Sequence, residues 1–235
     1  EMLTRDWSSD VCSSDLALVR DTKIALLAGI SGAGKDTIKK RLLLLPAFCD
    51  IVSHTTRPPR LNNSRPEIDG VDYHFIDLAA ADQMLQRHEF IEAKFVHGTV
   101  YGTSVAELKA IHDDGRTAIT DIDVQGVAEY EAMSPDCIAI FIVPPDFKTW
   151  MTRLKSRYAT EAEFQAEWPK RRDSAIKELA HVLEVPYYHV IINDDLERAV
   201  RVCREIIERG DVFVRQDDEA RLVARDLLEV LQAEG

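Results

Sequence analysis

The hydrophobic and polar positions of the chain follow two different periods in alternation. Short apolar runs rich in β-branched residues predict strands at residues 23–28, 51–54, 117–123, 137–143 and 189–193. Between or after these runs, apolar residues recur at helical spacing and predict helices at residues 35–45, 79–87, 105–113, 146–157 and 196–208. Strands that alternate with helices are typical of a parallel sheet with helices on both faces. We therefore predict an α/β fold, a three-layer sandwich around a parallel central sheet.

Three segments do not follow this alternation. Residues 54–103 are rich in loops and short strands with aromatic residues, and we interpret them as an inserted subdomain. Residues 1–20 repeat Ser-Ser-Asp without periodicity and lack the basic and long apolar regions of a signal peptide. We interpret them as a disordered leader or an artefact of cloning or sequence assembly. An amphipathic pattern at 218–231 predicts an extra helix within a C-terminal extension, residues 211–235.

The most informative motif is a glycine-rich turn between the first strand and the first helix. Residues 29–35 read G-I-S-G-A-G-K and match the phosphate-loop pattern G-x-x-x-x-G-K. Its glycines can adopt backbone angles closed to other residues, so that successive N–H groups turn inward around an anion. The positive end of the following helix and the Lys35 ammonium act at the same point. The residues expected to contact a nucleoside triphosphate are Gly29, Ser31, Gly32, Ala33, Gly34, Lys35, Asp36 and Thr37.

One position of this motif departs from the usual pattern. A Ser or Thr normally follows the loop lysine and supplies a hydroxyl to Mg²⁺, but this chain has Asp36, followed by Thr37. Carboxylate oxygens are good ligands for Mg²⁺. Our hypothesis is that Asp36 contacts the metal directly or through water, with the Thr37 hydroxyl as the competing ligand.

Composition and charge exclude several classes of protein. The chain has 235 residues, enough for one large domain or a core with small inserted subdomains. Its net charge of −12 argues against a nucleic-acid partner or an anionic membrane. No apolar run approaches the roughly 20 residues of a membrane span. The cysteines are widely spaced without a C-x-x-C pair, which favours free thiols in a reducing cytoplasm; they are Cys12, Cys49, Cys137 and Cys203.

A basic segment early in the chain is a candidate phosphate receptor. Residues 53–60 read S-H-T-T-R-P-P-R, and the two prolines favour a polyproline II conformation, which repeats every three residues. Arg57 and Arg60 would then project to the same side, beside the hydroxyl of Ser53. Two guanidinium groups on a stiff segment can bind a phosphate, to which Tyr73 can also donate. The alternative is a solvated basic turn.

Two carboxylates follow the predicted strand at 117–120. Alternation along a strand places Asp121 and Asp123 on the same side. Ligands of an open parallel sheet bind outside the carboxyl ends of its strands. The pair therefore suits either a magnesium shell or the base and ribose of a nucleotide. For Asp123 the alternative is an N-cap of the following helix.

The order and spacing of five motifs resemble those of guanylate kinases. The motifs are T-T-R-P-P-R, D-G-V-D-Y-H-F, E-F-I-E-A, V-Y-G-T-S and D-I-D-V-Q-G, and the resemblance covers about residues 23–209. It implies a P-loop NTPase fold with a guanylate kinase-like domain at 21–210. The implied parts are a core at 21–53, 104–152 and 183–210, a GMP-binding subdomain at 54–103 and a lid at 153–182.

The resemblance also implies how the acceptor nucleotide is bound. The GMP phosphate would be held by Ser53, Arg57, Arg60 and Tyr73, and the base would be bound by Glu92, Tyr101, Thr103 and Asp123. Glu92 would accept hydrogen bonds from guanine N1–H and the 2-amino group, with Thr103 at O6. Adenine lacks both donors, and leaving a buried charged group unpaired costs upward of about 1–3 kcal/mol. Sites of this kind can discriminate by roughly 10⁴-fold.

Four arginines are candidates for a cationic lid. Arg153 and Arg157 are four residues apart, so they would repel each other on a helix unless an anion lay between them. The resemblance places such arginines over the triphosphate together with a third, for which Arg171 is the better match and Arg172 the fallback. The glycines that the family often has around the second arginine are absent, and a break is expected at Trp168-Pro169.

The resemblance implies phosphoryl transfer from ATP to GMP, and also to dGMP, with Mg²⁺ as the metal. Asn193 would lie near the adenine, Asp121 near the metal and phosphates with Asp36 and Thr37. The reaction needs no covalent intermediate, because positioning and charge neutralisation suffice. The neutralising residues would be Lys35, Arg57, Arg153, Arg157 and Arg171. We expect a cytoplasmic monomer or homodimer that binds neither nucleic acid nor membranes.

Two alternatives to this function stay open. A ribose 1,5-bisphosphate phosphokinase-like enzyme is favoured by Asp36 but disfavoured by Glu92, Tyr101 and Thr103. A non-catalytic guanylate-kinase-like interaction module would typically lack a working phosphate loop and the lid arginines, both of which this chain has.

Overall fold

The computed structural model describes residues 13–62, 65–96, 98–210 and 214–233. They form two compact units, each built from segments that are distant in the sequence. Unit 1 takes its described residues from Glu1–Ile24, Pro46–Thr120 and Glu131–Asp136, and unit 2 from Ala25–Leu45, Asp121–Tyr130 and Cys137–Gly235.

Unit 2 is built on a parallel sheet with the strand order β1-β10-β11. The strands are β1 (Ile24–Ala28), β10 (Ile138–Val143) and β11 (Tyr188–Ile192). All of β1 and nearly all of β10 are buried, as expected for parallel strands with helices on both faces. The predicted α/β class with a parallel sheet is therefore confirmed.

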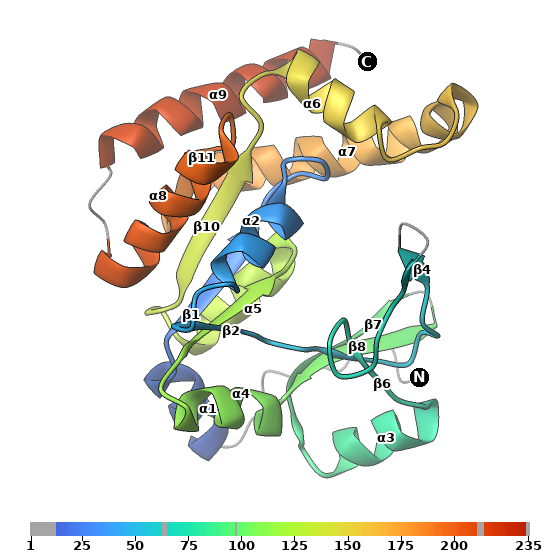
Figure 1. The fold of residues 1–235 in the computed structure, drawn as a ribbon, viewed down its shortest axis with the longest axis vertical. Coiled ribbons are helices and arrows are strands. Elements are labelled where there is room, and N and C mark those ends of the chain that lie inside the picture. The colour runs from blue at the N-terminus through green and yellow to red at the C-terminus, as the bar shows by residue number, and fades with distance from the viewer. Residues whose placement is uncertain (1–12, 63–64, 97, 211–213, 234–235) are drawn as a thin grey trace. The chain divides into compact units, whose positions relative to one another are not determined.

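Helices cover the sheet of unit 2, as Figure 1 shows for α8 and α9 beside β11. In this unit α2 contacts α8, and α7 contacts α9. The helices are α2 (Lys35–Leu42), α6 (Phe147–Lys155), α7 (Glu161–Glu184), α8 (Leu196–Arg209) and α9 (Val214–Ala233). Helix α9 confirms the predicted helical extension and buries Ala220, Ala224, Leu227 and Leu231. Its apolar spacing of three to four residues forms the stripe that packs on its neighbours.

Unit 1 contains a parallel strand pair and a separate four-stranded sheet. The pair is β2 (Phe48–Asp50) with β9 (Thr117–Asp121), whose last residue, Asp121, belongs to unit 2. The sheet has the order β6-β3-β8-β7, made of β3 (His54–Thr55), β6 (His74–Phe75), β7 (Phe90–Val96) and β8 (Thr99–Ser104). The unit also contains a hairpin of β4 (Leu61–Asn62) and β5 (Arg65–Pro66). Its helices are α1 (Ser13–Asp21), α3 (Leu78–Gln86) and α4 (Val105–Asp113). Helix α5 (Val124–Met133) contributes residues to both units.

Two predictions near the N-terminus were wrong. Most of the predicted strand at 51–54 is the connection between two short strands, because the chain leaves its pairing with β9 after Asp50 and begins to pair with β8 at His54. The expectation of a disordered leader fails for residues 13–20, which belong to α1; there Val19 is fully buried and Arg20 Nε donates to the Met133 carbonyl at 3.1 Å. Residues 1–12 lie outside the described part of the chain.

Two predictions near the lid were also wrong. Helix α6 ends at Lys155 with Ser156 as C-cap, so Arg157 lies in the following turn and not on the helix with Arg153. The expected break at Trp168-Pro169 is absent, because α7 continues through Pro169. The Trp168 ring packs against Phe164 and Trp150 at centroid distances of 5.6 and 5.8 Å, which supports the helix at this point.

The described cysteines agree with the prediction of free thiols. Cys49, Cys137 and Cys203 are free, as expected, and Cys12 lies outside the described residues. Among the described helices, none combines the length and the apolar character needed to cross a membrane.

Candidate active site

The turn between β1 and α2 has the phosphate-loop conformation that the sequence predicts. Gly29, Gly32 and Gly34 have φ angles of 141°, 88° and 101°, which confirms that each uses the freedom of glycine. At Gly29 a Cβ atom would lie 2.2 Å from the Ile142 carbonyl oxygen. Any larger residue at this position would therefore push the loop away from β10.

A cavity of about 260 Å³ in unit 2 lies at this loop. Its walls come from the loop, the end of β9 and the lid region. The lining residues are Gly29, Ser31, Gly32, Gly34, Lys35, Asp36, Asp121, Ile122, Asp123, Arg157, Arg171, Ser174 and Glu178. Of the predicted residues in unit 2, four lie outside this described lining: Ala33, Thr37, Arg153 and Asn193.

Lys35 is the cation at the centre of this pocket. Its ammonium donates a hydrogen bond to the Gly29 carbonyl across the loop. Burial lowers the pKa of Lys35, and the nearby Glu178, Asp36 and Asp121 carboxylates act in the opposite direction. A triphosphate would supply further negative charge and so favour the charged amine.

The two carboxylates at the end of β9 both line the pocket, as does Ile122 between them, so strand alternation alone does not account for their placement. Asp121 forms an ion pair with Lys39 at 2.6 Å, with 34% of its side chain exposed. Burial by itself would raise the pKa of Asp121, but the ammonium groups of Lys39 and Lys35 outweigh it and lower the pKa. Asp123 accepts a hydrogen bond from the Gly126 N–H at 2.7 Å. Asp123 therefore makes the N-cap hydrogen bond and also lines the pocket.

The four lid arginines divide into two pairs. Arg157 and Arg171 line the pocket, where Arg157 donates to the Ser31 hydroxyl at 3.4 Å and Arg171 to the Tyr158 hydroxyl at 3.2 Å. Arg153 instead donates to the Asn193 carbonyl at 2.9 Å. Arg172, the fallback for Arg171, donates to the Leu231 carbonyl of α9 at 2.9 Å. Of the two adjacent arginines, Arg171 is thus the one at the pocket.

Asn193 holds the phosphate loop through a side-chain hydrogen bond. Its side chain is buried and donates to the Ala33 carbonyl at 2.7 Å. A Cβ atom on Gly34 would lie 2.3 Å from the same amide nitrogen, so the two residues are in close contact. The proposed place of Asn193 near adenine stays a prediction, and its observed role is to hold the loop.

Three residues at the site were not predicted from the sequence. Lys39 pairs with Asp121, and Ser174 and Glu178 of α7 line the pocket. Ser174 and Glu178 follow Arg171 by three and seven residues, which places all three on one helical face. The Ser174 hydroxyl donates to Glu178 at 2.7 Å. Burial raises the pKa of Glu178, and the Ser174 hydrogen bond and the Lys35 charge oppose that rise. The helical spacing from Arg171 was the signal that could have found them.

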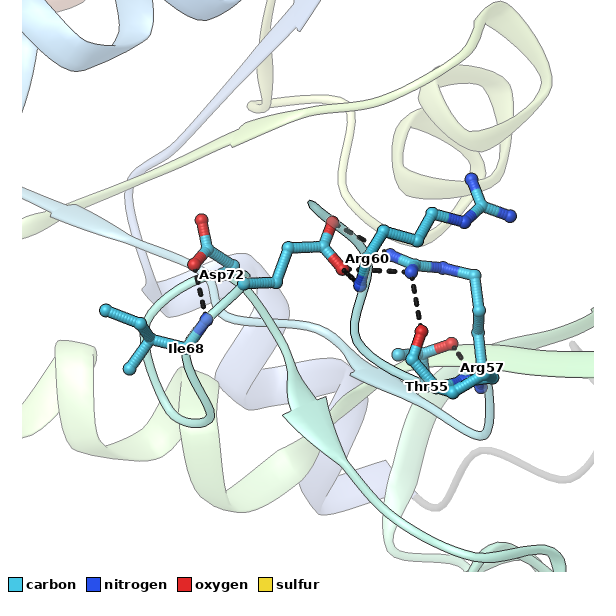
Figure 2. A network of polar contacts seen from close by, with 7 residues as sticks. Thr55, Arg57, Arg60, Ile68 and Asp72 are labelled. Atoms are coloured by element: carbon cyan, nitrogen blue, oxygen red, sulfur yellow. Dashed lines mark hydrogen bonds and ion pairs between the residues drawn. The ribbon is translucent and has the colours of Figure 1, made fainter. Parts of the chain in front are cut away.

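Unit 1 holds a second cluster of predicted residues around Arg57. The two terminal nitrogens of Arg57 bond the two Glu67 oxygens at 2.9 and 3.0 Å, and Glu67 also accepts from the Arg60 backbone N–H at 2.8 Å. Both side chains of the ion pair are 8% exposed. Figure 2 shows this network, with the Arg60 guanidinium extending away from it. Arg57 and Arg60 therefore have different environments. Glu67, the partner of Arg57, was not predicted from the sequence.

Two tyrosines surround the same guanidinium. The Arg57 guanidinium carbon lies 5.3 Å from the centroid of the Tyr73 ring, and the rings of Tyr73 and Tyr101 are 6.1 Å apart. The hydrogen bond that Arg57 donates to Glu67 is the main reason that the pKa of Arg57 is raised, and a hydrogen bond with Tyr101 adds to it. The structure thus brings together three of the residues predicted to bind an acceptor nucleotide.

Glu92 and Thr103 form a direct pair on adjacent strands of unit 1. They are register partners on β7 and β8, next to an irregularity between Phe90 and Glu92. The Thr103 hydroxyl donates to the Glu92 carboxylate at 2.8 Å, and Thr103 is buried. This bond fixes one carboxylate oxygen and leaves acceptor capacity on the group. The arrangement suits recognition of a ligand that presents two N–H donors.

Comparison with known proteins decides the family. The family model described as guanylate kinase matches residues 21–210. The chain belongs to the guanylate kinase family. It is 36% identical over 189 residues to the guanylate kinase of Syntrophotalea carbinolica, covering 80% of this chain and 86% of that protein. Guanylate kinase 1 of Oryza sativa subsp. japonica is 38% identical over 192 residues, and the match covers 80% of this chain but about half, 48%, of that longer protein.

A solved structure agrees with this assignment. The crystal structure of guanylate kinase from Anaplasma phagocytophilum matches with a TM-score of 0.60 and 27% identity, covering 89% of this chain and 94% of that chain. The predicted family, fold class and enzyme class of a nucleoside monophosphate kinase are thereby confirmed.

The acidic groups at the pocket of this guanylate kinase family member suit a metal that arrives with the nucleotide. Asp36 and Asp121 both line it and offer the hard oxygen donors that Mg²⁺ prefers. In the described part of the chain, no group of three or more His, Cys, Asp or Glu residues is arranged to hold a metal by itself. Mg²⁺ typically binds through one or two carboxylates together with substrate phosphates, so these donors fit it.

Proposed function

We propose that this chain transfers the γ-phosphoryl group of ATP to GMP, giving ADP and GDP. The observation that carries the proposal is the Glu92–Thr103 pair in the unit that also holds the Arg57 cluster. A base-reading carboxylate and a phosphate-binding guanidinium in one unit make a binding site for a nucleoside monophosphate. Family membership supports the same reaction.

ATP would bind at the phosphate-loop pocket of unit 2. The backbone N–H groups of the loop surround the phosphates, and Lys35 follows the transferred group. Arg157 and Arg171, which already line the pocket, would neutralise the charge on the equatorial oxygens in the transition state. Arg153 would act indirectly, because its guanidinium bonds the carbonyl of Asn193, whose side chain holds the phosphate loop.

The GMP phosphate would bind near Arg57, Arg60, Ser53 and Tyr73. Glu67 occupies one edge of the Arg57 guanidinium, and the Pro58 carbonyl accepts a further bond from Nη1 at 2.8 Å. The phosphate would therefore use the N–H donors that remain on Nη2 and Nε. Arg60 is exposed and extends outward, so it is free to turn toward an anion. Glu67 thereby orients Arg57 and also keeps its charge partly neutralised when GMP is absent.

The base would be read by Glu92 with Thr103. Glu92 can accept from guanine N1–H and from the 2-amino group, whereas adenine offers neither donor. Tyr101, the partner of Lys94 in the same strand pairing, would close the site beside the ribose and phosphate. Because the 2′-hydroxyl is not needed for these contacts, we expect dGMP to be accepted as well.

Mg²⁺ would be held by Asp36 or Thr37, and by Asp121, together with the phosphates. When bound, the ion neutralises charge on the phosphate oxygens. The chain itself positions both substrates and excludes water, and it needs no general base because the GMP phosphate is already anionic. Lys39 holds Asp121 in place through their ion pair. We also propose a cytoplasmic monomer or homodimer that binds neither nucleic acid nor membranes.

Substitution of Glu92 tests the base-reading role directly. Glu92→Gln replaces the acceptor with an amide, and we expect kcat/KM for GMP to fall by about 100-fold while ATP binding stays unchanged. Glu89→Gln is the matched control, because Glu89 lies at the same end of the sheet but pairs only loosely with Arg87, at 3.8 Å. Equal losses for GMP and ATP, or an unchanged Glu92→Gln variant, would rule out this role.

A second candidate function is favoured by one observation. Asp36 lines the pocket at the position where Ser or Thr is usual, which suits a kinase for ribose 1,5-bisphosphate. The Glu92–Thr103 pair has no partner groups on such a substrate, so it argues against this function. A non-catalytic module is disfavoured by Lys35, Arg157 and Arg171, which meet in one pocket.

A further inference from the structure

Three backbone carbonyls of the phosphate loop are held by side-chain donors. Lys35 donates to Gly29, the Trp150 indole N–H donates to Ser31 at 2.7 Å, and Asn193 donates to Ala33 at 2.7 Å. Trp150 and Asn193 lie 119 and 160 residues after their acceptors. The loop conformation is therefore set partly by residues that no loop motif contains.

The bond from Trp150 fixes the direction of one peptide group. In a trans peptide the carbonyl of one residue and the N–H of the next point in opposite directions. Since the Ser31 carbonyl faces the indole, the Gly32 N–H faces away from it. Gly32 itself lines the pocket at the phosphate loop.

The Trp150 indole is enclosed by neighbouring side chains. Trp150 is fully buried, and its ring packs against Phe147 and Trp168 at centroid distances of 5.9 and 5.8 Å. A Cβ atom on Gly32 would lie 3.4 Å from the indole nitrogen, so the ring lies directly against the loop. The indole N–H is thus a fixed donor on a rigid support.

The same helix joins the loop to the lid arginines. Trp150 lies on α6, three residues before Arg153, whose guanidinium holds the Asn193 carbonyl. Arg157 follows α6 and donates to the Ser31 hydroxyl, on the residue whose carbonyl Trp150 holds. A shift of Trp150 would therefore disturb both the loop and the helix that leads to Arg157.

We propose that Trp150 is a positioning residue for phosphoryl transfer, which turns the Gly32 N–H toward the ATP phosphates and couples α6 to the phosphate loop. This role rests on the proposed binding of ATP at the loop, and it does not depend on the identity of the acceptor. Trp150 touches no substrate in this role. It acts through the Ser31–Gly32 peptide.

The test compares two Trp→Phe substitutions in the same aromatic cluster. Trp150→Phe keeps a buried ring but removes the N–H, and Trp168→Phe changes the neighbouring ring without removing the bond to Ser31. We expect Trp150→Phe to raise the Kd for ATP, measured by calorimetry, and the KM for ATP by about tenfold. The KM for GMP should stay within about twofold. Trp168→Phe should bind ATP like the parent chain.

A folded Trp150→Phe variant with an unchanged Kd for ATP would overturn the proposal. If wild-type chain binds ATP but does not phosphorylate GMP, the proposed function fails while the Trp150 role is still judged by ATP binding. Should Trp150→Phe not fold, the indole N–H resonance of the wild-type chain gives the answer. The chain has three tryptophans, so Trp168→Phe and Trp7→Phe assign the Trp150 signal by elimination. We expect slow solvent exchange and a shift on ATP addition; fast exchange without a shift would overturn the proposal.

Discussion

Arg57 and Glu67 form a two-point ion pair, in which each terminal guanidinium nitrogen bonds one carboxylate oxygen, at 2.9 and 3.0 Å. The pair is 8% exposed on both sides and lies beside the Tyr73 ring. Because such bidentate pairs fix the plane of the guanidinium, Glu67 would decide how Arg57 is presented to a phosphate at the proposed GMP site. The proposed acceptor site would then be organised by a residue outside the basic motif at 53–60.

Glu67→Gln should weaken GMP binding more than ATP binding. The amide keeps the size of the side chain but loses the charge and one acceptor, so Arg57 is no longer held in one plane. We expect the KM for GMP to rise by about tenfold, as for the loss of a charge-assisted hydrogen bond, with the KM for ATP unchanged. Initial rates at varied GMP and ATP measure both values. A variant with a lower KM for GMP would show that Glu67 competes with the phosphate rather than orienting Arg57.

Arg171 and Arg172 are adjacent but should differ in effect. Arg171 lines the pocket, so Arg171→Ala should lower kcat by about 100-fold or more with little change in thermal stability. Arg172 holds the Leu231 carbonyl of α9, so Arg172→Ala should lower Tm by about 2–4 °C and leave kcat near its original value. Steady-state rates and thermal melts of the two variants, measured side by side, check the division. It fails if Arg172→Ala is the variant that loses turnover.

Asp36 should control the magnesium dependence. If its carboxylate is a ligand, Asp36→Ala will raise the half-saturating Mg²⁺ concentration by about tenfold, and Asp36→Ser will also change the profile. Thr37→Val is the matched control, because Thr37 is exposed and lies outside the described pocket lining. Rates at fixed ATP and varied Mg²⁺ give the comparison. An unchanged profile for Asp36→Ser, with a shifted one for Thr37→Val, would assign the metal to Thr37.

His54 should make the stability of the chain depend on pH. Its ring lies 4.6 Å from the His74 ring, and its buried Nδ1 has no hydrogen-bond partner among the described residues. Burial lowers the pKa of His54 from 6.5, and the neighbouring His74 adds to this, while Glu107 and Asp69 oppose it. A lowered folded-state pKa gives stability that is present above the unfolded pKa and lost as pH falls through the folded pKa.

His54→Asn should therefore flatten this dependence. We expect the Tm of the parent chain to fall between pH 7 and pH 5 by roughly 2 °C more than that of the variant. His88→Asn is the control, since His88 is exposed and its positive φ of 54° suits asparagine. Thermal melts at several pH values give the result. Parallel curves for His54→Asn and the parent chain would show that another group is responsible.

The sequence predicted the central strands well because their signal is local. Strands β1, β10 and β11 lie within one or two residues of their predicted ends, since each is an apolar run between polar turns. Helix α4 has the predicted bounds, with Ser104 as its cap. Helix α1 was missed because its burial depends on distant partners such as the Met133 carbonyl.

The candidate site was predictable where a motif carries it. The loop glycines, Lys35 and the Glu92–Thr103 pair are close in sequence or part of a recognisable pattern. Trp150 and Lys39 were not predictable, because each acts on a partner that is distant in the sequence, Ser31 and Asp121. Their types and spacing are those of ordinary core or surface positions of a helix. Only the tertiary structure shows what they hold.

Acceptor specificity separates GMP phosphorylation from the alternative functions of this chain. The measurement is kcat/KM with ATP and Mg²⁺ for GMP, AMP and ribose 1,5-bisphosphate, in one coupled assay of ADP release. We predict a preference for GMP over AMP of roughly 10⁴-fold, because guanine offers N1–H and a 2-amino group to the Glu92 carboxylate, which Thr103 holds, and adenine offers neither. Preferential use of ribose 1,5-bisphosphate, or ATP binding without any transfer to GMP, would show that the chain is not a GMP kinase.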